Sequence, residues 1–242
     1  MSAIEIQCLT KTYKNVTAVR DLSLTVEDGE LFALLGVNGA GKSTLIRCLT
    51  CITAPTSGEA LVGGHSITGE AALVKKKIAV SPQSTAIAQN LTVGENLMLM
   101  ARLSGMDKAT AEAKMADTVQ SFGLDSVIKR RAGKLSGGWQ RRLSLAMALI
   151  TEPEILFLDE PTLGLDVLAR AELWDIIRGL KGKVTVVLTT HYMEEAESLS
   201  DRIGIMNGGS LVTVGTPAEL LERTGTAKVE DAFVKIVKEV EI

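Results

Sequence analysis

The amino-acid sequence predicts an α/β fold with a mainly parallel core sheet covered by helices, an N-terminal antiparallel β region and an inserted helical lobe. Short unbroken apolar runs alternate with helical patterns, as in parallel sheets that are buried on both faces. Residues 3–28 instead alternate apolar and polar types, as two half-buried strands do. Between residues 90 and 151 the pattern changes to successive helices, with breaks at Gly105 and Gly123.

The apolar runs give the order of the expected elements. Core strands are expected at residues 31–35, 78–80, 155–158 and 184–188. The runs 203–206 and 211–214 flank Asn207, Gly208 and Gly209, which predicts a β-hairpin, and short helices are expected from Pro217 and from Val229. At 242 residues the chain is expected to form one domain, with a core of residues 1–89 and 152–224, a helical lobe of residues 90–151 and a helical tail of residues 225–242.

Composition and charge exclude several classes of protein. With 46% hydrophobic and 23% charged residues, the chain is globular rather than disordered. Its net charge of −3 and the absence of a long basic block argue against nucleic acid as the main partner. No stretch reaches the roughly 20 apolar residues of a membrane-spanning helix, and the N-terminus has no secretory pattern. We therefore expect a cytoplasmic chain that does not cross a bilayer by itself.

Two cysteines have the C-x-x-C spacing that is used by zinc and redox sites. Cys48 and Cys51 lie in an apolar helical pattern, and the sequence contains no second pair of this kind. Buried, reduced thiols are therefore expected at both positions.

A glycine-rich segment follows the strand expected at residues 31–35. Gly36, Gly41, Lys42 and Ser43 fit the pattern G-x-x-x-x-G-K-[ST], and a helix is expected to begin there. Such a loop lets backbone N–H groups surround phosphates at a helix N-terminus. Lys42 is then expected to reach the β- and γ-phosphates of ATP and to act in catalysis, and Ser43 to coordinate Mg²⁺. The other phosphate-binding candidates are Asn38, Gly39, Ala40 and Thr44. A mere strand-to-helix turn would explain the glycines but not Lys42 and Ser43.

Two acidic residues follow another expected strand. Asp159 and Glu160 come directly after the run 155–158, at the carboxyl end of a strand, where open α/β sheets bind ligands. Asp159 is placed to hold Mg²⁺, directly or through water, whereas Glu160 would orient and deprotonate the water that attacks the γ-phosphate. Acids at strand ends are common, but together with the phosphate-binding loop they predict a nucleoside-triphosphate hydrolase.

The segment of residues 135–140 makes a family resemblance specific. It contains Ser136, Gly137 and Gly138 at the expected start of a helix. In this segment the sequence resembles the ABC ATPase family, whose signature motif completes the ATP site of a facing subunit. A serine hydroxyl and glycine amides at a helix start suit a γ-phosphate, and the serine also suits a helix cap. Trp139 stands where the family usually has glutamine, and Gln140 follows one step later.

Further positions match the family in order. The resemblance implies that Tyr13 stacks on adenine with Val19 beside the base. It implies that Gln83 approaches both Mg²⁺ and the attacking water, contributes to catalysis and leads into the helical lobe. It also implies that Asp166 lies in a loop that crosses a dimer interface, and that His191 is a catalytic switch near the γ-phosphate. Each of these residues would otherwise be an ordinary packing or solvent-facing residue.

The resemblance also implies a mechanism and partners. Two such domains sandwich two ATP molecules head to tail, so the chain is expected to pair with a copy of itself or a similar subunit. Gln83 would link the nucleotide to the helical lobe, which pushes on a membrane-spanning permease subunit on another chain. The chain would then be the peripheral ATPase of an ABC transporter at the inner face of the cell membrane. Residues 91–97 and 229–233 resemble ATP-binding subunits of bacterial ABC-2-type exporters.

Two other functions remain open from the sequence. A soluble, non-transport ABC ATPase, such as an assembly or remodelling factor, would share these motifs. Ribosome-associated relatives carry a second ATPase unit and repair relatives carry long insertions, and neither occurs in this sequence. A small-molecule kinase would use the phosphate loop but leave Ser136, Gly138 and His191 without a role. The cargo cannot be named, because cargo contacts in this family reside on the membrane subunit.

Overall fold

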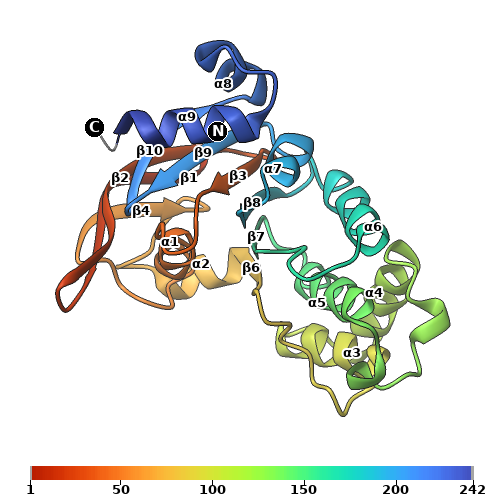
Figure 1. Cartoon of the computed structure of the whole chain (residues 1–242). Helices are drawn as coiled ribbons and strands as arrows, with labels where there is room; N and C mark the ends of the chain where they lie inside the picture. Colours follow the sequence, from red (N-terminus) through yellow and green to blue (C-terminus); the bar gives the residue numbers. More distant parts are fainter. Residues whose placement is uncertain (1, 241–242) are drawn as a thin grey trace.

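A computed structural model describes residues 2–240 of the chain (Figure 1). Met1 and residues 241–242, which belong to the predicted core and tail, lie outside the described residues. The strands are β1 (Ser2–Tyr13), β2 (Val16–Glu27), β3 (Leu31–Leu35), β4 (Ser57–Val62), β5 (His65–Ser66), β6 (Ile78–Ser81), β7 (Ile155–Asp159), β8 (Thr185–Thr190), β9 (Arg202–Asn207) and β10 (Ser210–Gly215). The helices are α1 (Lys42–Leu49), α2 (Ala71–Lys77), α3 (Val93–Leu103), α4 (Lys108–Ser121), α5 (Gly137–Leu149), α6 (Val167–Arg178), α7 (Met193–Leu199), α8 (Pro217–Thr224) and α9 (Val229–Val240).

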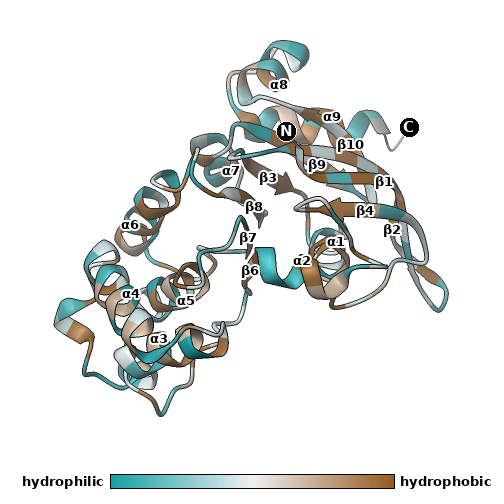
Figure 2. Ribbon diagram, turned by 180° about the vertical axis from the view of Figure 1, so that it is seen from behind, coloured by the Kyte–Doolittle hydropathy of each residue, from teal (hydrophilic) through white to brown (hydrophobic). Residues whose placement is uncertain are grey.

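The larger sheet confirms the predicted α/β class and positions the site. Its strand order is β10-β9-β3-β8-β7-β6, and only β10 pairs antiparallel with its neighbour, in the predicted hairpin with β9. Every residue of β3 and β8 is buried, which explains the unbroken apolar run of β3. Figure 2 shows β3 as brown, apolar ribbon. Leu35 lies beside Thr190, and Asp159 beside Thr189, so the carboxyl ends of β3, β7 and β8 meet at one edge.

The smaller sheet has the order β2-β1-β4-β5 and is antiparallel throughout. Both predicted N-terminal strands are present, and their pairing contains several register shifts. The elements β4, β5 and α2 are not predicted by the sequence analysis. Helix α1 packs into the same apolar cluster as both sheets, through Leu45, Ile46 and Leu49. The phosphate-binding loop therefore enters a helix that is fixed on both sides.

The two cysteines of the C-x-x-C pattern are free thiols near the end of α1. Cys48 is buried and Cys51 is half-buried. Burial raises the pKa of both thiols, which makes them less reactive. In the part of the chain that the structure describes, no group of three His, Cys, Asp or Glu side chains could hold a metal ion.

Helices α3, α4 and α5 form a lobe at one side of the larger sheet (Figure 1). Helix α3 begins with a capping box in which Thr92 and Glu95 bond each other's backbone N–H groups. The fully buried Asn96 accepts a hydrogen bond from the Ala88 N–H at 2.8 Å and donates to the Ala88 carbonyl at 3.1 Å. This amide therefore ties the segment after Gln83 to the lobe. The predicted boundaries between core, lobe and tail stay a prediction.

No helix between residues 2 and 240 combines the length and the apolar character needed to cross a membrane.

Candidate functional site

The phosphate-binding loop joins β3 to α1 and forms the floor of an open hollow. Gly41 has a φ of 101°, and a Cβ at this position would lie 2.2 Å from the Ala18 carbonyl oxygen. Only glycine fits there, because the left-handed conformation and the close approach both exclude a side chain. This first hollow is lined by Ala18, Asn38, Gly39, Ala40, Gly41, Lys42, Ser43, Thr44, Gln83 and Glu160. The fold thus brings the loop together with Gln83 and one of the two acids.

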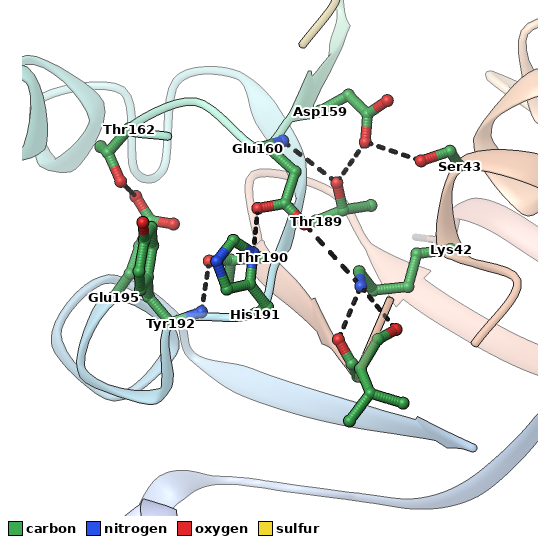
Figure 3. A network of polar contacts seen from close by, with 12 residues as sticks. Lys42, Ser43, Asp159, Glu160, Thr162, Thr189, Thr190, His191, Tyr192 and Glu195 are labelled. Carbon is green, nitrogen blue, oxygen red and sulfur yellow. Dashed lines mark hydrogen bonds and ion pairs between the residues drawn. The ribbon is translucent and has the colours of Figure 1, made fainter. Parts of the chain in front are cut away.

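Lys42 is folded back over the loop, as Figure 3 shows. Its Nζ donates to the Gly36 carbonyl at 2.6 Å and to the Val37 carbonyl at 3.2 Å. The same ammonium lies 3.8 Å from Glu160 Oε1. Burial lowers the pKa of Lys42, and the nearby carboxylates of Glu160 and Asp159 oppose that shift. A buried ammonium held only by carbonyls and one carboxylate is well placed to receive an anionic phosphate.

Three oxygen-bearing side chains gather beside the loop. Ser43 Oγ donates to Asp159 Oδ1 at 3.1 Å, and Thr189 Oγ1 donates to the same oxygen at 2.5 Å. Hydroxyl and carboxylate oxygens are the ligands that Mg²⁺ prefers, and this ion usually takes its remaining ligands from phosphate and water. Ser43 and Asp159 therefore fit a magnesium ion that arrives with a nucleotide.

Glu160 is the most constrained residue of the site. Its φ of 50° is unusual for a residue with a side chain, and its N–H donates to the Thr189 carbonyl at 3.1 Å. Its buried carboxylate lies between Lys42 and His191, whose Nδ1 is 2.6 Å from Glu160 Oε2. The backbone hydrogen bond, Lys42 and His191 thus fix the position of the Glu160 carboxylate at the edge of the hollow.

Arg141 is a buried residue that the sequence analysis misses. From α5, its guanidinium donates to the carbonyls of Pro82 at 2.5 Å, Gln83 at 3.1 Å, Asp159 at 3.2 Å and Pro161 at 2.5 Å, and also to that of Glu160. Desolvation lowers the pKa of this group, and neighbouring carboxylates oppose the shift. One side chain of the helical lobe therefore joins the Gln83 segment to the segment of the paired acids.

A second hollow lies at the start of α5 and α6. It is lined by Ser136, Gly138, Trp139, Arg142, Asp166, Leu168, Ala169, Glu172 and Leu173, and shares no residue with the first hollow. Gly137 is the first residue of α5. Asp166 caps α6 by accepting from the Ala169 N–H at 2.9 Å. The Arg142 guanidinium stacks 4.7 Å from the centre of the Trp139 ring.

Ser136 stands at the N-cap of α5, but its side chain makes no capping hydrogen bond. The expectation of a serine cap is therefore wrong for the hydroxyl, which is left available to another group. The neighbouring Leu168 is 77% exposed, and Val167 is 70% exposed. Such apolar side chains beside a polar hollow are typical of a surface that another protein covers.

The adenine-binding expectation needs one correction. Val19 is fully buried in the core, so its side chain cannot lie beside a base, whereas the preceding residue, Ala18, lines the first hollow. Tyr13 is 43% exposed, and the Lys11 ammonium lies 4.9 Å from the centre of its ring. Tyr13 does not line the hollow, so its role stays a prediction.

A phosphate-binding loop carries a buried lysine and, directly after it, a serine that bonds Asp159 at the end of β7, where the fixed Glu160 follows. This combination defines the class of nucleoside-triphosphate hydrolases. Residues 19–163 match the model of a protein family described as ABC transporter. The chain is 43% identical over 224 residues to the Nod factor export ATP-binding protein I of Rhizobium etli, covering 92% of this chain and 71% of that protein. It is 42% identical over 225 residues to the daunorubicin/doxorubicin resistance ATP-binding protein DrrA of Streptomyces peucetius, covering 93% and 68% respectively.

Solved structures give the same result. The ATP-binding subunit of an ABC transporter superimposes with a TM-score of 0.87 at 27% identity, over 97% of this chain and 99% of that one. A dimeric ATP-binding cassette in a post-hydrolysis state, bound to ADP and Pi, superimposes with a TM-score of 0.79 at 26% identity, over 88% and 98%. The chain belongs to the ABC transporter family and is one of its ATP-binding, ATP-hydrolysing subunits.

Proposed function

We propose that this chain drives export across the cell membrane, lying at its inner face and bound to a membrane-spanning subunit on another chain. The observation that carries the export assignment is the extended identity to an export protein and to a drug-resistance protein, each over more than nine-tenths of this chain. The site geometry supports the hydrolytic step, and a groove between the helical lobe and the larger sheet is the candidate docking surface for the partner.

Hydrolysis would proceed in the first hollow. Glu160 accepts a proton from the water that attacks the γ-phosphate, and His191 holds one oxygen of that carboxylate in place. Lys42 exchanges its carbonyl partners for the β- and γ-phosphates, and Gln83 faces the same space from the segment before the lobe. When bound to Ser43 and Asp159, Mg²⁺ would offset the charge on the phosphate oxygens.

The second hollow supports a two-subunit site. Ser136 and Gly138 line it, together with Asp166, yet none of them lines the hollow that contains Lys42 and Glu160. A second subunit, turned to face the first, would bring its Ser136 and Gly138 to this chain's phosphate loop. The exposed Leu168 beside these residues would then be covered. The dimeric state of the solved relative supports the same arrangement.

A groove between the lobe and the larger sheet is the candidate docking site for the membrane-spanning subunit. It is lined by Lys75, Lys76, Ile78, Ala79, Val80, Met100, Leu103, Ser104, Met106, Ala148 and Thr151. Its apolar floor and two lysines suit an amphipathic helix with an acidic end. The groove reaches β6, whose last residue, Ser81, lies two positions before Gln83. A movement of the groove caused by the partner would therefore be transmitted to the nucleotide site through the short segment between Ser81 and Gln83.

Affinity purification from gently solubilised native membranes tests this proposal. The tagged chain should retain a multi-helix membrane protein in near-stoichiometric amount. Leu103→Glu should lose that protein without unfolding, because Leu103 is 72% exposed in the groove. Ile52→Glu is the matched control, since Ile52 is 61% exposed and does not line the groove. Recovery of soluble proteins alone would refute the transporter assignment in favour of an assembly or remodelling ATPase, and would leave the hydrolytic chemistry intact.

A further inference from the structure

Glu195 is a carboxylic acid buried in the protein, outside both hollows. It lies in α7 and is completely inaccessible to solvent. Its Oε1 accepts a hydrogen bond from Thr162 Oγ1 at 2.7 Å and another from Trp174 Nε1 at 3.1 Å. Among the residues that the structure describes, its Oε2 is the only buried side-chain nitrogen or oxygen without a hydrogen-bond partner.

The three members of this contact come from three segments, two of which adjoin Glu160 and His191 in the chain. Thr162 lies two residues after Glu160, and Glu195 lies four residues after His191. Trp174 belongs to α6, whose first turn carries the cap Asp166. Figure 3 shows Glu195 and Thr162 on the side of the Glu160–His191 pair that faces away from Lys42. Glu195 therefore links the loop after Glu160 to the helix after His191.

Judged by folding stability alone, the buried carboxyl of Glu195 is unfavourable. A buried carboxyl with one unsatisfied oxygen is less favourable than an apolar side chain of similar volume. Burial raises the pKa of Glu195 above its ordinary value. The side chains of Thr190, Thr162 and Trp174 oppose this shift, whereas the negative charge of Glu160 adds to it. Thr162 and Trp174 are themselves buried, and Glu195 accepts a hydrogen bond from each, so removal of the carboxyl would leave two buried donors without an acceptor. The polar contact is thus better explained by what it holds in place than by its contribution to folding.

We propose that Glu195 is a positioning residue for ATP hydrolysis: its carboxyl holds Thr162, and thereby fixes Glu160 relative to His191. The inference rests on the proposed roles of Glu160 and His191. Glu195 does not line the first hollow, so it acts on the rate of hydrolysis and leaves nucleotide affinity unchanged. Displacement of a reacting group by about 1 Å lowers a rate by as much as about 100-fold.

The test uses the full chain with steady-state hydrolysis and nucleotide binding measured side by side. Glu195→Met removes both hydrogen bonds at similar volume and should lower kcat at least about tenfold, with the Kd for ATP within about twofold. Glu195→Gln keeps an acceptor for Thr162 and Trp174 and should stay within about threefold of the parent kcat. Thr162→Val should reproduce the Glu195→Met loss. The double variant should lose no more than Glu195→Met alone, because both substitutions remove the same bond between Thr162 and Glu195.

A matched control separates positioning from general destabilisation. Thr224 is also buried, and its hydroxyl bonds the Leu220 carbonyl at 2.8 Å in α8, away from the site. Thr224→Val should lower the free energy of unfolding and leave kcat unchanged. The inference is overturned by a normal kcat in Glu195→Met, by parallel losses of binding and rate, or by an equal loss of rate in Thr224→Val. A Glu160→Gln variant run alongside identifies the source of failure. If Glu160→Gln also hydrolyses ATP normally, the proposed role of Glu160 is refuted. If Glu160→Gln is inactive, only the role assigned to Glu195 is refuted.

Discussion

Replacement of Arg141 by methionine should weaken the domain and its catalysis together, because one guanidinium serves five backbone carbonyls in a buried setting. Each carbonyl that stays dry and unpaired costs about 1–3 kcal/mol. Gln83 lines the open hollow, where water can reach its carbonyl, and the Glu160 carbonyl also accepts from the Leu163 N–H at 3.2 Å. The carbonyls of Pro82, Asp159 and Pro161 would then be left without this donor. We therefore expect Arg141→Met to lower the free energy of unfolding by about 3–5 kcal/mol, as for other buried charged networks that lose one member.

Urea denaturation and steady-state hydrolysis, both at a temperature where the variant stays folded, provide the assay. The total stability of a domain is about 5–15 kcal/mol, so the variant should remain folded in the cold. Its kcat should fall at least about tenfold, because Gln83 and Glu160 are no longer held by one group. Arg141→Lys should recover only part of both losses, since an ammonium cannot span five acceptors. Lys108→Met is the control: its ion pair with Glu112 is exposed and is worth at most about 1 kcal/mol. If Arg141→Met matches this control in stability and rate, the hydrogen bonds of Arg141 do not have the importance assigned to them.

Four further variants test other parts of the site. Glu160→Gln should bind ATP normally, release phosphate at least about 100-fold more slowly and accumulate as an ATP-dependent dimer in gel filtration; normal turnover would remove Glu160 from its role. His191→Ala should lower kcat by about 10- to 100-fold with little change in ATP affinity, because Glu160 loses the partner that orients it. Gln83→Ala should weaken stimulation of hydrolysis by the proposed membrane-spanning subunit more than it weakens ATP binding, and equal losses would contradict a coupling role. Glu195→Gln should flatten the dependence of stability on pH. Folding raises the pKa of Glu195, so between the ordinary glutamate pKa and the raised value the folded protein binds more protons than the unfolded one. The parent's free energy of unfolding therefore falls as pH rises through that window. Urea denaturation of both proteins, from the ordinary glutamate pKa upward, measures this difference, and equal slopes in the two proteins would contradict a raised pKa.

The sequence predicts those parts of the site whose residues lie close together in the chain at fixed spacing. The phosphate loop needs glycine at Gly41 and a lysine directly after it, and such residue types at fixed spacing are visible without a structure. Arg141 leaves no such trace, because all five of its acceptors are backbone carbonyls, which every residue type provides. Glu195 is hidden for a different reason. An acid in a short polar helix resembles a solvent-facing residue until the packing of Trp174 and Thr162 around it is known.

The misplacement of Val19 has an identifiable physical cause. Alternation along a strand tells which face a side chain occupies only if the pairing is regular. Between β1 and β2 the register shifts between the pairs Leu9–Leu22 and Lys11–Val19, and Asp21 has a φ of 43°. A bulge of this kind exchanges inward- and outward-facing positions, so Val19 enters the core and Ala18 lines the hollow. The family resemblance therefore points to the right part of β2, but the side chain that lines the hollow belongs to the neighbouring residue.

Strand register also brings together the side chains of the proposed hydrolytic site. Glu160 and His191 each follow the last residue of a neighbouring parallel strand, and Asp159 pairs with Thr189. The Glu160 N–H bonds the Thr189 carbonyl, so the turn after β7 is fixed to β8 rather than to its own loop. A one-residue slip between these strands would separate Glu160 from His191 and turn Thr189 away from Asp159. The flanking segments are further held by Arg141 and Glu195, so the proposed geometry of hydrolysis depends on the whole sheet edge. Because Arg141 bonds the backbone carbonyl of Glu160, a movement of the lobe that carries Arg141 would reach Glu160 through a single side chain.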